Sequence, residues 1–387
     1  MKLEELSDLF DEGIPVKLIR LSKSVVGPEE AAEVSRVIEL GYLGMGQEVK
    51  LFEDELKSFI GGDRDVLCVS TGTSAIHLAL QALGIGPGDE VLVPSLTYLA
   101  TFQAISATGA KPTACDVSIK NGFIDVVDAQ KRITSKTKAI VPVHYGSSSQ
   151  GIEDVYIFAK KNGLRVVEDA AHSFGCIHAG QRIGSTGDII CFSFDGIKNI
   201  TSGEGGAVVT GDREVSAKIK DARLLGVEKD TDKRFNGERS WLFDVHYQGW
   251  RYHMSNIMAA IGRAQLKKIG KYGSIRREIA LQYVDRLRNL SGLELLQISY
   301  ENLIPHIFPV RILSGKRQIV SQLLKEAGVE TGIHYQPNHL LSFYKSTYSL
   351  PISEQLGGEL LSLPLHPDVT ESDQLRICTL LEKILKA

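Results

Sequence analysis

One lysine in the sequence stands where a reactive amine is expected rather than a surface charge. Lys198 lies in the segment CFSFDGIKNITSGEGG, five positions after Ser193 and just before a glycine-rich return into another apolar run. A lysine in a loop is usually a solvated charge, but Ile197 and Ile200 flank this one and indicate an enclosed site. A lysine held out of water loses its proton more easily and becomes a nucleophile toward carbonyl carbon.

Two further segments place polar side chains directly after apolar strands. In VVEDAAH, Asp169 either faces a ligand site at the end of a strand or caps a following helix. In VSTGTSA, the residues Gly72, Thr73 and Ser74 stand at the start of a predicted helix. Free backbone N–H groups at such a start bind phosphate, although Ser and Thr are also ordinary N-cap residues. Each segment alone therefore has a functional and a structural interpretation.

The three segments together match the requirements of one cofactor. Pyridoxal phosphate needs a lysine for a Schiff base, an acidic partner for its pyridinium nitrogen and a site for its phosphate. Lys198, Asp169 and the hydroxyl residues near Gly72 supply these groups. The aspartate keeps the ring nitrogen protonated, which makes the ring an electron sink for a substrate carbanion. We therefore expect the chain to bind pyridoxal 5′-phosphate.

The elements that must position these groups alternate between residues 65 and 210. Short β-branched runs are separated by segments such as 74–83 and 98–108, whose apolar residues recur three and four apart. This order favours parallel strands in a sheet that is covered on both faces, with its ligand site at the carboxyl edge. The predicted strands are Val66–Val69, Glu90–Val93, Lys111–Cys115, Ala139–Val143, Arg165–Glu168, Asp188–Phe194 and Gly206–Thr210.

The pattern changes near residue 255. Amphipathic helices are predicted over 255–269, 274–290, 315–327 and 371–386. A short strand candidate covers 306–312. We predict a large cofactor-binding domain over 1–255, which includes an N-terminal segment, and a smaller α+β domain over 256–387. The polar stretch 230–244 has no periodicity and is expected to be a mobile surface loop or part of an interface.

Composition limits the partners and the location of the protein. The 387 residues carry 44 Lys+Arg and 47 Asp+Glu, and the net charge of −3 gives no overall attraction to nucleic acid or to an anionic membrane. No stretch approaches the roughly 20 continuous apolar residues that cross a bilayer. The N-terminus MKLEELSDLFDEG lacks the layout of a secretion signal. Five widely spaced cysteines, without zinc-ligand spacing, are expected to be core residues, so we predict a cytoplasmic protein with no metal site.

Motifs along most of the chain carry a resemblance to a known family. FSFDGIKNITSGEGGAVVT, VVEDAAHSFG, STGTSAIHLAL and VPSLTYLATFQAI resemble the motifs of the DegT/DnrJ/EryC1/StrS family, the nucleotide-sugar aminotransferases. The resemblance runs from GYLGMGQEVKLFEDELKSFIG to HYQPNHLLSFY. It implies an α/β type I pyridoxal-phosphate fold, like that of aspartate aminotransferase, with a mixed, mostly parallel sheet and a smaller α+β C-terminal domain. It also implies a homodimer in which the neighbouring subunit completes each active site.

The resemblance implies roles for single residues. Lys198 is similar to the Schiff-base lysine, Asp169 to the pyridinium partner and Tyr98 to the aromatic residue that stacks on the cofactor ring. His172 falls where the family has Gln or His beside the phenolic oxygen of the cofactor. The residues implied at the phosphate, beside Gly72 of the helix start, are Thr73, Ser74 and Ser193.

One segment departs from the family pattern. In QGWRYHMSNIMAAIG the family often has an Asn that reaches the phosphate in the partner subunit. This chain has Arg251 and His253 there, and no Asn before Asn256. Arg251 either replaces the contact by a charge-assisted bond to phosphate or pairs with a carboxylate.

The resemblance implies transfer of an amino group from glutamate to C3 or C4 of a nucleotide-linked keto-deoxysugar. Such a product serves amino-sugar and glycan biosynthesis, for example that of lipopolysaccharide. One alternative is a sugar dehydratase of the same family, which carries His in place of the lysine, and another is a non-catalytic regulatory protein. The presence of Lys198 argues against the dehydratase, and the presence of both Lys198 and Asp169 argues against the non-catalytic protein. A cysteine desulfurase would need a reactive loop cysteine, which the sequence does not suggest.

Recognition of the sugar is expected to depend on loops, because loops carry binding residues on a rigid scaffold. The loops concerned are 41–47, 144–150, 229–244 and 334–339. From these loops alone, the nucleotide (UDP, dTDP or GDP) and the aminated carbon stay open.

Overall fold

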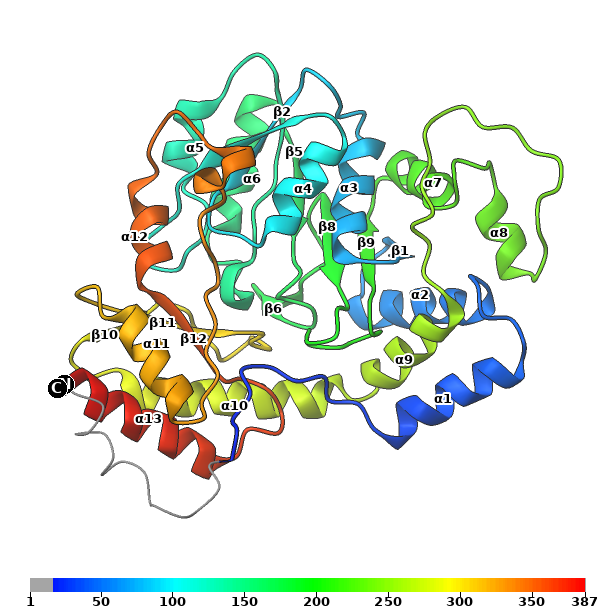
Figure 1. Cartoon of the computed structure of the whole chain (residues 1–387). Coiled ribbons are helices and arrows are strands. Elements are labelled where there is room, and N and C mark those ends of the chain that lie inside the picture. The colour runs from blue at the N-terminus through cyan, green and yellow to red at the C-terminus, as the bar shows by residue number, and fades with distance from the viewer. Residues whose placement is uncertain (1–16, 387) are drawn as a thin grey trace.

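The computed structural model describes residues 17–386 and contains a central sheet of seven strands (Figure 1). The strand order is β1-β9-β8-β5-β4-β2-β3. The bounds are β1 (Asp65–Val69), β2 (Glu90–Pro94), β3 (Lys111–Cys115), β4 (Thr137–Ile140), β5 (Arg165–Asp169), β8 (Ile189–Ser193) and β9 (Gly206–Thr210). All seven predicted strands are found, whereas the N-terminal segment MKLEELSDLFDEG, which lacks the layout of a secretion signal, lies outside the described residues.

The predicted mixed, mostly parallel sheet is confirmed. β2, β3, β4, β5 and β8 pair in parallel, but β9 is antiparallel to both of its neighbours, β8 and β1. The connection 194–205 contains no helix that could return the chain across the sheet, so β9 runs back beside β8. Since β1 and β8 are both antiparallel to β9, they point the same way. The carboxyl ends of β1, β2, β5 and β8 therefore meet at one edge.

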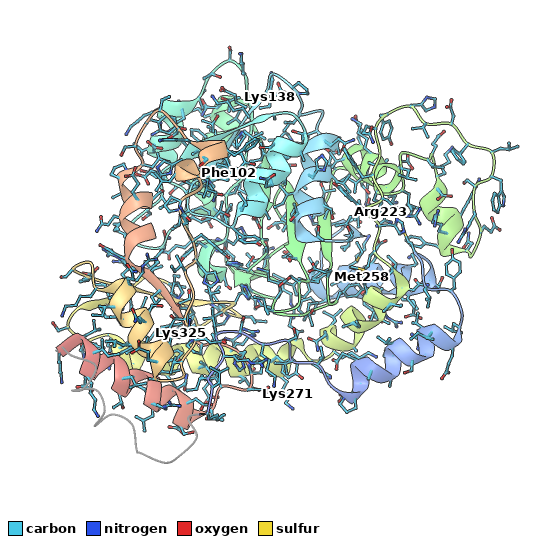
Figure 2. All side chains as sticks on the ribbon, in the orientation of Figure 1. Phe102, Lys138, Arg223, Met258, Lys271 and Lys325 are labelled. Carbon is cyan, nitrogen blue, oxygen red and sulfur yellow. The ribbon has the colours of Figure 1, made fainter. Side chains whose placement is uncertain are left out.

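Helices cover both faces of the sheet, as the apolar strands predict. α3 (Gly72–Ala82), α4 (Leu99–Ala107) and α7 (Arg213–Ala222) pack on one face, and Phe102 of α4 lies in the core formed there (Figure 2). The other face is covered by α2 (Gln47–Ile60), α5 (Val126–Arg132) and α6 (Ile152–Asn162). Successive residues of β1 point to opposite faces of the sheet. Leu67 packs in the core on the side of α3, and Cys68 packs in the core on the side of α2.

A second, antiparallel sheet organises the C-terminal part. It has the order β10 (Leu293–Leu295), β11 (Phe308–Ile312) and β12 (Leu360–Leu363). The helices of this part are α10 (Ile269–Leu287), α11 (Arg317–Glu326), α12 (Pro351–Glu359) and α13 (Glu371–Lys386). α9 (Asn256–Leu266) packs against α1 (Pro28–Glu39) and α2 instead, and Ile19 pairs with Val329. The domain boundary at residue 255 stays a prediction.

The stretch 230–244 differs from the predicted loop. It begins with a short helix, α8 (Asp230–Phe235), in which Arg234 forms an ion pair with Asp230 at 2.5 Å. This pair, one helical turn apart, explains local helix formation that apolar periodicity did not reveal. After α8 the chain exposes Trp241, Leu242 and Phe243.

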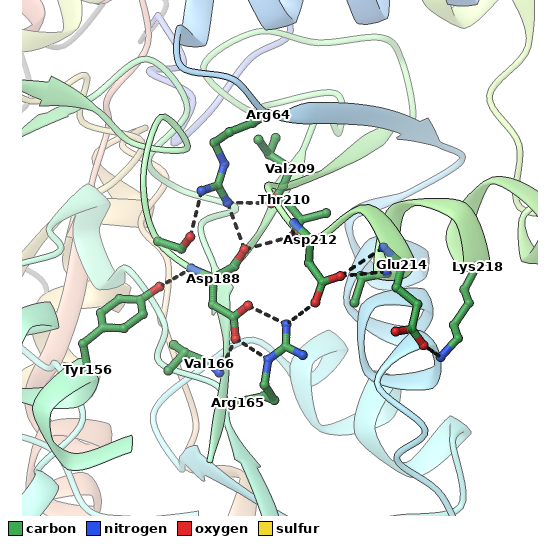
Figure 3. Close-up of polar contacts among 12 residues, drawn as sticks. Arg64, Tyr156, Arg165, Val166, Asp188, Val209, Thr210, Asp212, Glu214 and Lys218 are labelled. Carbon is green, nitrogen blue, oxygen red and sulfur yellow. Dashed lines mark hydrogen bonds and ion pairs between the residues drawn. The ribbon is translucent and has the colours of Figure 1, made fainter. Parts of the chain in front are cut away.

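Polar contacts fix the edge of the sheet where β5 and β8 begin (Figure 3). Arg165 donates to both carboxylate oxygens of Asp188, at 2.8 and 2.7 Å, and to Asp212 at 3.1 Å. A short hairpin, β6 (Ile177–His178) and β7 (Gln181–Arg182), precedes β8. The carboxyl ends of the same strands lie at the opposite edge of the sheet. Within residues 17–386, no helix is long and apolar enough to cross a membrane.

Candidate active site

A cavity of about 440 Å³ lies where the carboxyl ends of the strands meet. Five segments that end or follow strands of the large sheet line it, together with residues from the C-terminal part such as His306 and Tyr335. Seven of the nine residues that the sequence predicts at the site share this cavity: Gly72, Thr73, Tyr98, Asp169, His172, Ser193 and Lys198. The sheet direction accounts for this convergence, since each residue follows or ends a strand at that edge.

Lys198 lies in the connection from β8 to β9, and its neighbours hold this connection in place. The buried side-chain amide of Asn199 donates to the carbonyl oxygens of Phe174 at 3.0 Å and of Ile304 at 2.9 Å. Burial lowers the pKa of Lys198 to about 8, against the opposite influence of the Asp195 and Asp169 carboxylates. The uncharged, nucleophilic fraction of the amine near neutral pH is therefore much larger than that of a solvated lysine.

Asp169 ends β5, and its carboxylate is buried in the wall of the cavity. One carboxylate oxygen accepts from the Thr101 hydroxyl at 2.7 Å, and the other accepts from the backbone N–H of Ala171 at 3.2 Å. Residues 170–176 form turns and contain no helix, so the interpretation of Asp169 as a helix cap is wrong. The carboxylate is instead held rigidly at the strand end, facing the cavity.

The start of α3 confirms the N-cap interpretation of its hydroxyl residues, while the phosphate interpretation stays a prediction. Thr71 and Ser74 form a capping box, in which each side chain accepts from the backbone N–H of the other at 3.0 Å. Ser74 is buried in this cap and does not line the cavity, so its place at a phosphate stays a prediction. The N–H groups of Gly72 and Thr73 have no acceptor among residues 17–386 and are available to a ligand.

Gly72 allows the start of α3 to approach the end of β8 closely. A Cβ at position 72 would lie 2.8 Å from the Cβ of Ser193, which ends β8. The absence of a side chain therefore keeps the N–H groups and the Ser193 hydroxyl on one small concave surface. Such a surface, at the positive end of a helix, fits a phosphate group.

Aromatic and imidazole rings border the remaining space. Tyr98 directly precedes α4, and its ring centroid lies 5.7 Å from that of Tyr335. His172 is bonded through Nε2 to the Tyr335 hydroxyl at 2.9 Å, while its buried Nδ1 has no partner in the described part of the chain. Burial holds the pKa of His172 well below its usual range, and the nearby Lys198 adds to this effect. A neutral ring with a free nitrogen fits a hydroxyl-bearing ligand such as pyridoxal phosphate.

Arg251 lies apart from this cavity within one chain. It pairs with Leu224 and lines a smaller cavity of about 120 Å³ with Phe243 and His253. Asn256 begins α9, where its amide donates to the backbone oxygen of Tyr42 at 2.9 Å. The action of Arg251 on the phosphate of a second subunit therefore stays a prediction.

The sequence did not single out every residue of the cavity. His306 enters it from the segment before β11, and Tyr335 and His334 enter from the loop that was predicted to recognise sugar. The available signal for His306 was a histidine inside the apolar run LIPHIF. That pattern is more often a core histidine, which is why position in space was needed to identify it.

Comparison with known proteins gives consistent matches along the chain. A model of the DegT/DnrJ/EryC1/StrS aminotransferase family matches residues 25–382. Uncharacterized protein MJ1066 of Methanocaldococcus jannaschii is 34% identical over 370 residues, covering 93% of this chain and 96% of that protein. DesV of S. venezuelae, solved in complex with a ketimine intermediate, is 32% identical with a TM-score of 0.84, covering 93% of this chain and 95% of DesV.

A further solved structure was determined with the cofactor that the sequence predicts. Spr1654 of Streptococcus pneumoniae, provisionally described as a sugar aminotransferase, is 25% identical in its PLP-form with a TM-score of 0.88. The match covers 96% of this chain and 99% of Spr1654. The predicted fold class is confirmed by these structures. With a family model that spans almost all of its length, the chain belongs to the DegT/DnrJ/EryC1/StrS aminotransferase family.

Proposed function

We propose that this aminotransferase moves an amino group from glutamate to C3 or C4 of a nucleotide-linked keto-deoxysugar, with pyridoxal phosphate as its cofactor. The observation that carries the proposal is the position of Lys198, a lysine with a pKa of about 8 in the same cavity as Asp169 and the free start of α3. Membership in an aminotransferase family supports the reaction type, and the PLP-form of Spr1654 supports the cofactor.

Several residues of the cavity would hold the cofactor when it is bound. The N–H groups of Gly72 and Thr73 and the Ser193 hydroxyl would bind the phosphate. Asp169 keeps a proton on the ring nitrogen, and its bond from Thr101 fixes the carboxylate for this purpose. Tyr98 would cover the ring, and Nδ1 of His172, which has no partner in the described part of the chain, would bond to the phenolic oxygen.

Lys198 performs the proton transfers of the reaction. When bound, the cofactor supplies an electron sink that stabilises a carbanion at the carbon bearing the amino group. Lys198, once its amine is free and uncharged, takes the proton from that carbon of the donor and later returns a proton to the corresponding carbon of the sugar. Its pKa of about 8 suits both directions, because the charged acid stays abundant near neutral pH while the uncharged base is far more populated than in an ordinary lysine.

We further propose a cytoplasmic homodimer in which Arg251 reaches the cofactor phosphate of the other subunit. The exposed side chains of Trp241, Leu242 and Phe243, at 83%, 95% and 60%, support an interface at the loop after α8. Five buried cysteines without disulfides support a reducing compartment.

Replacement of Lys198 by Ala tests the proposal. We expect loss of the absorbance of the lysine-bound cofactor and loss of 2-oxoglutarate release from glutamate with a panel of UDP-, dTDP- and GDP-linked keto-sugars. Lys138→Ala is the matched control, because Lys138 is exposed on β4 away from the carboxyl edge (Figure 2). Full turnover by the Lys198→Ala protein would overturn the assignment, and a wild type that accepts none of the sugars would overturn the substrate class.

A further inference from the structure

His306 contacts the amine of Lys198, although the two residues come from different parts of the fold. Its Nε2 lies 3.2 Å from Nζ of Lys198, and both side chains line the same cavity. Lys198 belongs to the connection between β8 and β9, whereas His306 lies two residues before β11 of the small sheet. The contact therefore depends on how the two sheets are packed together.

The position of His306 is fixed from several sides. Its backbone N–H donates to the Ser147 hydroxyl at 2.9 Å, and its ring packs on that of His172 with the centroids 4.5 Å apart. Two residues earlier, the carbonyl of Ile304 accepts from Asn199, the residue after Lys198. The segments that carry the two side chains are thus bonded to each other, so the ring is held against the amine rather than placed there by a free side chain.

The chemistry of the pair suits a hydrogen bond between neutral groups. The ring is buried, and burial together with the nearby Lys198 holds the pKa of His306 well below its usual range. A neutral imidazole has one nitrogen that accepts, so Nε2 can accept an N–H of the amine and leave the nitrogen lone pair free. A lysine side chain has four rotatable carbon–carbon bonds, so ordering it costs conformational entropy. A fixed acceptor at its end reduces the conformations that the amine explores.

We propose that His306 is a positioning residue for Lys198, holding the free ε-amine by a hydrogen bond to Nε2 so that it stays directed into the cavity. This inference rests on the proposed function, in which Lys198 carries the proton transfers. A correctly oriented base is worth a large rate factor, because the reacting atoms need to start close together and aligned. Loss of the contact should therefore slow proton transfer without weakening the binding of the amino donor.

Three substitutions at position 306 distinguish a hydrogen-bonding role of His306 from a packing role. Gln at position 306 can place an amide oxygen near the position of Nε2, Asn places it near Nδ1, and Leu has no acceptor. We expect His306→Gln to keep the wild-type titration midpoint of Lys198 and the wild-type rate of the half-reaction with glutamate. We expect both His306→Asn and His306→Leu to change these two quantities. His178→Leu, in the β6–β7 hairpin, is the matched control for loss of a histidine elsewhere. The Gln and Asn pair remains informative if the Leu variant does not fold, which circular dichroism would show.

The first measurement is made on the full chain without cofactor and needs no substrate. Trace labelling of lysines with acetic anhydride across a pH series, read by mass spectrometry, gives the titration midpoint of Lys198. The titratable groups that line the cavity with Lys198 are Asp169, Asp195, Glu204, His172, His334 and Tyr335, and all variants keep them. Because an acceptor stabilises the charged amine, its loss in the Leu and Asn variants should lower the midpoint by about one pH unit. An unchanged midpoint in both would overturn the proposal.

The second measurement is the half-reaction with glutamate, with and without deuterium at Cα. We expect kcat to fall roughly tenfold in the Leu and Asn variants, with KM within about twofold and a larger isotope effect, since proton transfer becomes the slow step. Equal rates in all variants, or equal losses in Gln and Asn, would overturn the positioning role. A wild type that is inert to glutamate would instead contradict the proposed function, and the labelling result would still decide the role of His306.

Discussion

At the scale of single residues, the cavity sets the charge of one amine. Burial favours the uncharged form of Lys198, and two carboxylates, Asp195 and Asp169, oppose that effect without cancelling it. The geometry is consistent with this balance, because the amine lies 3.2 Å from Nε2 of His306, whose buried ring is neutral. The amine is therefore ready to react with an aldehyde before any substrate arrives.

This balance predicts the pH dependence of cofactor incorporation. Only the uncharged amine attacks the aldehyde, so the rate at which cofactor-free protein takes up pyridoxal phosphate should rise with pH and level off above about 8. Stopped-flow absorbance measures this rate, and Nα-acetyl-lysine, whose ε-amine is fully solvated, serves as the control. A rate that continues to rise toward the ordinary lysine pKa of 10.5 would show that Lys198 is solvated.

At the scale of elements, the turn from β1 into α3 is built without room for a side chain at Gly72. The Cβ of an alanine would lie 2.8 Å from the Cβ of Ser193, and β8 and α3 would have to separate at the surface that fits a phosphate. This steric clash lies at the carboxyl edge of the sheet, so we expect it to weaken ligand binding more than it disturbs the hydrophobic core.

Gly72→Ala is therefore expected to weaken cofactor binding by tenfold or more while costing only about 1 kcal/mol of the free energy of unfolding of the cofactor-free protein. Fluorescence titration with pyridoxal phosphate and urea denaturation measure the two effects. Gly211→Ala is the control, because a Cβ there meets no atom within 4 Å. Comparable cofactor affinity in both variants would contradict a phosphate site at the start of α3.

The sequence predicts these elements well because their signals are local. Lys198, Asp169 and Gly72 each follow an apolar strand within a few residues, and the strand direction brings them to one edge. The reversal of β9 was not expected from strand–helix alternation, since it depends on a connection without a helix. The role of Ser74 in a cap rather than in the cavity wall was also hidden, because sequence does not show which way a hydroxyl points.

At the scale of the whole molecule, two sheets contribute to one cavity. His306 belongs to the C-terminal sheet region, some hundred residues after Lys198. Contacts between distant segments have no local pattern in a single sequence, so the histidine in LIPHIF gave no sign that it would meet the lysine. A single sequence also gives no local pattern for the proposed contact of Arg251, because that contact would be made to the cofactor phosphate in another copy of the chain.

A test of shared sites by complementation addresses Arg251. If this residue acts on the cofactor phosphate of the other subunit, Arg251→Ala and Lys198→Ala chains are each inactive, but a hybrid dimer regains one intact site. Random mixing after dissociation gives half hybrids with one of two sites restored, so activity should return to about a quarter of the wild type.

The control for complementation mixes Lys198→Ala with Asp169→Asn. Lys198 and Asp169 line one cavity of a single chain, so in that hybrid each of the two sites keeps one defect and no activity should return. If the Arg251 mixture also stays inactive while size-exclusion chromatography shows hybrid dimers, Arg251 acts within its own chain or pairs with a carboxylate. If no dimer forms at all, the exposed Trp241, Leu242 and Phe243 serve another purpose, and the cavity of one chain must suffice for catalysis.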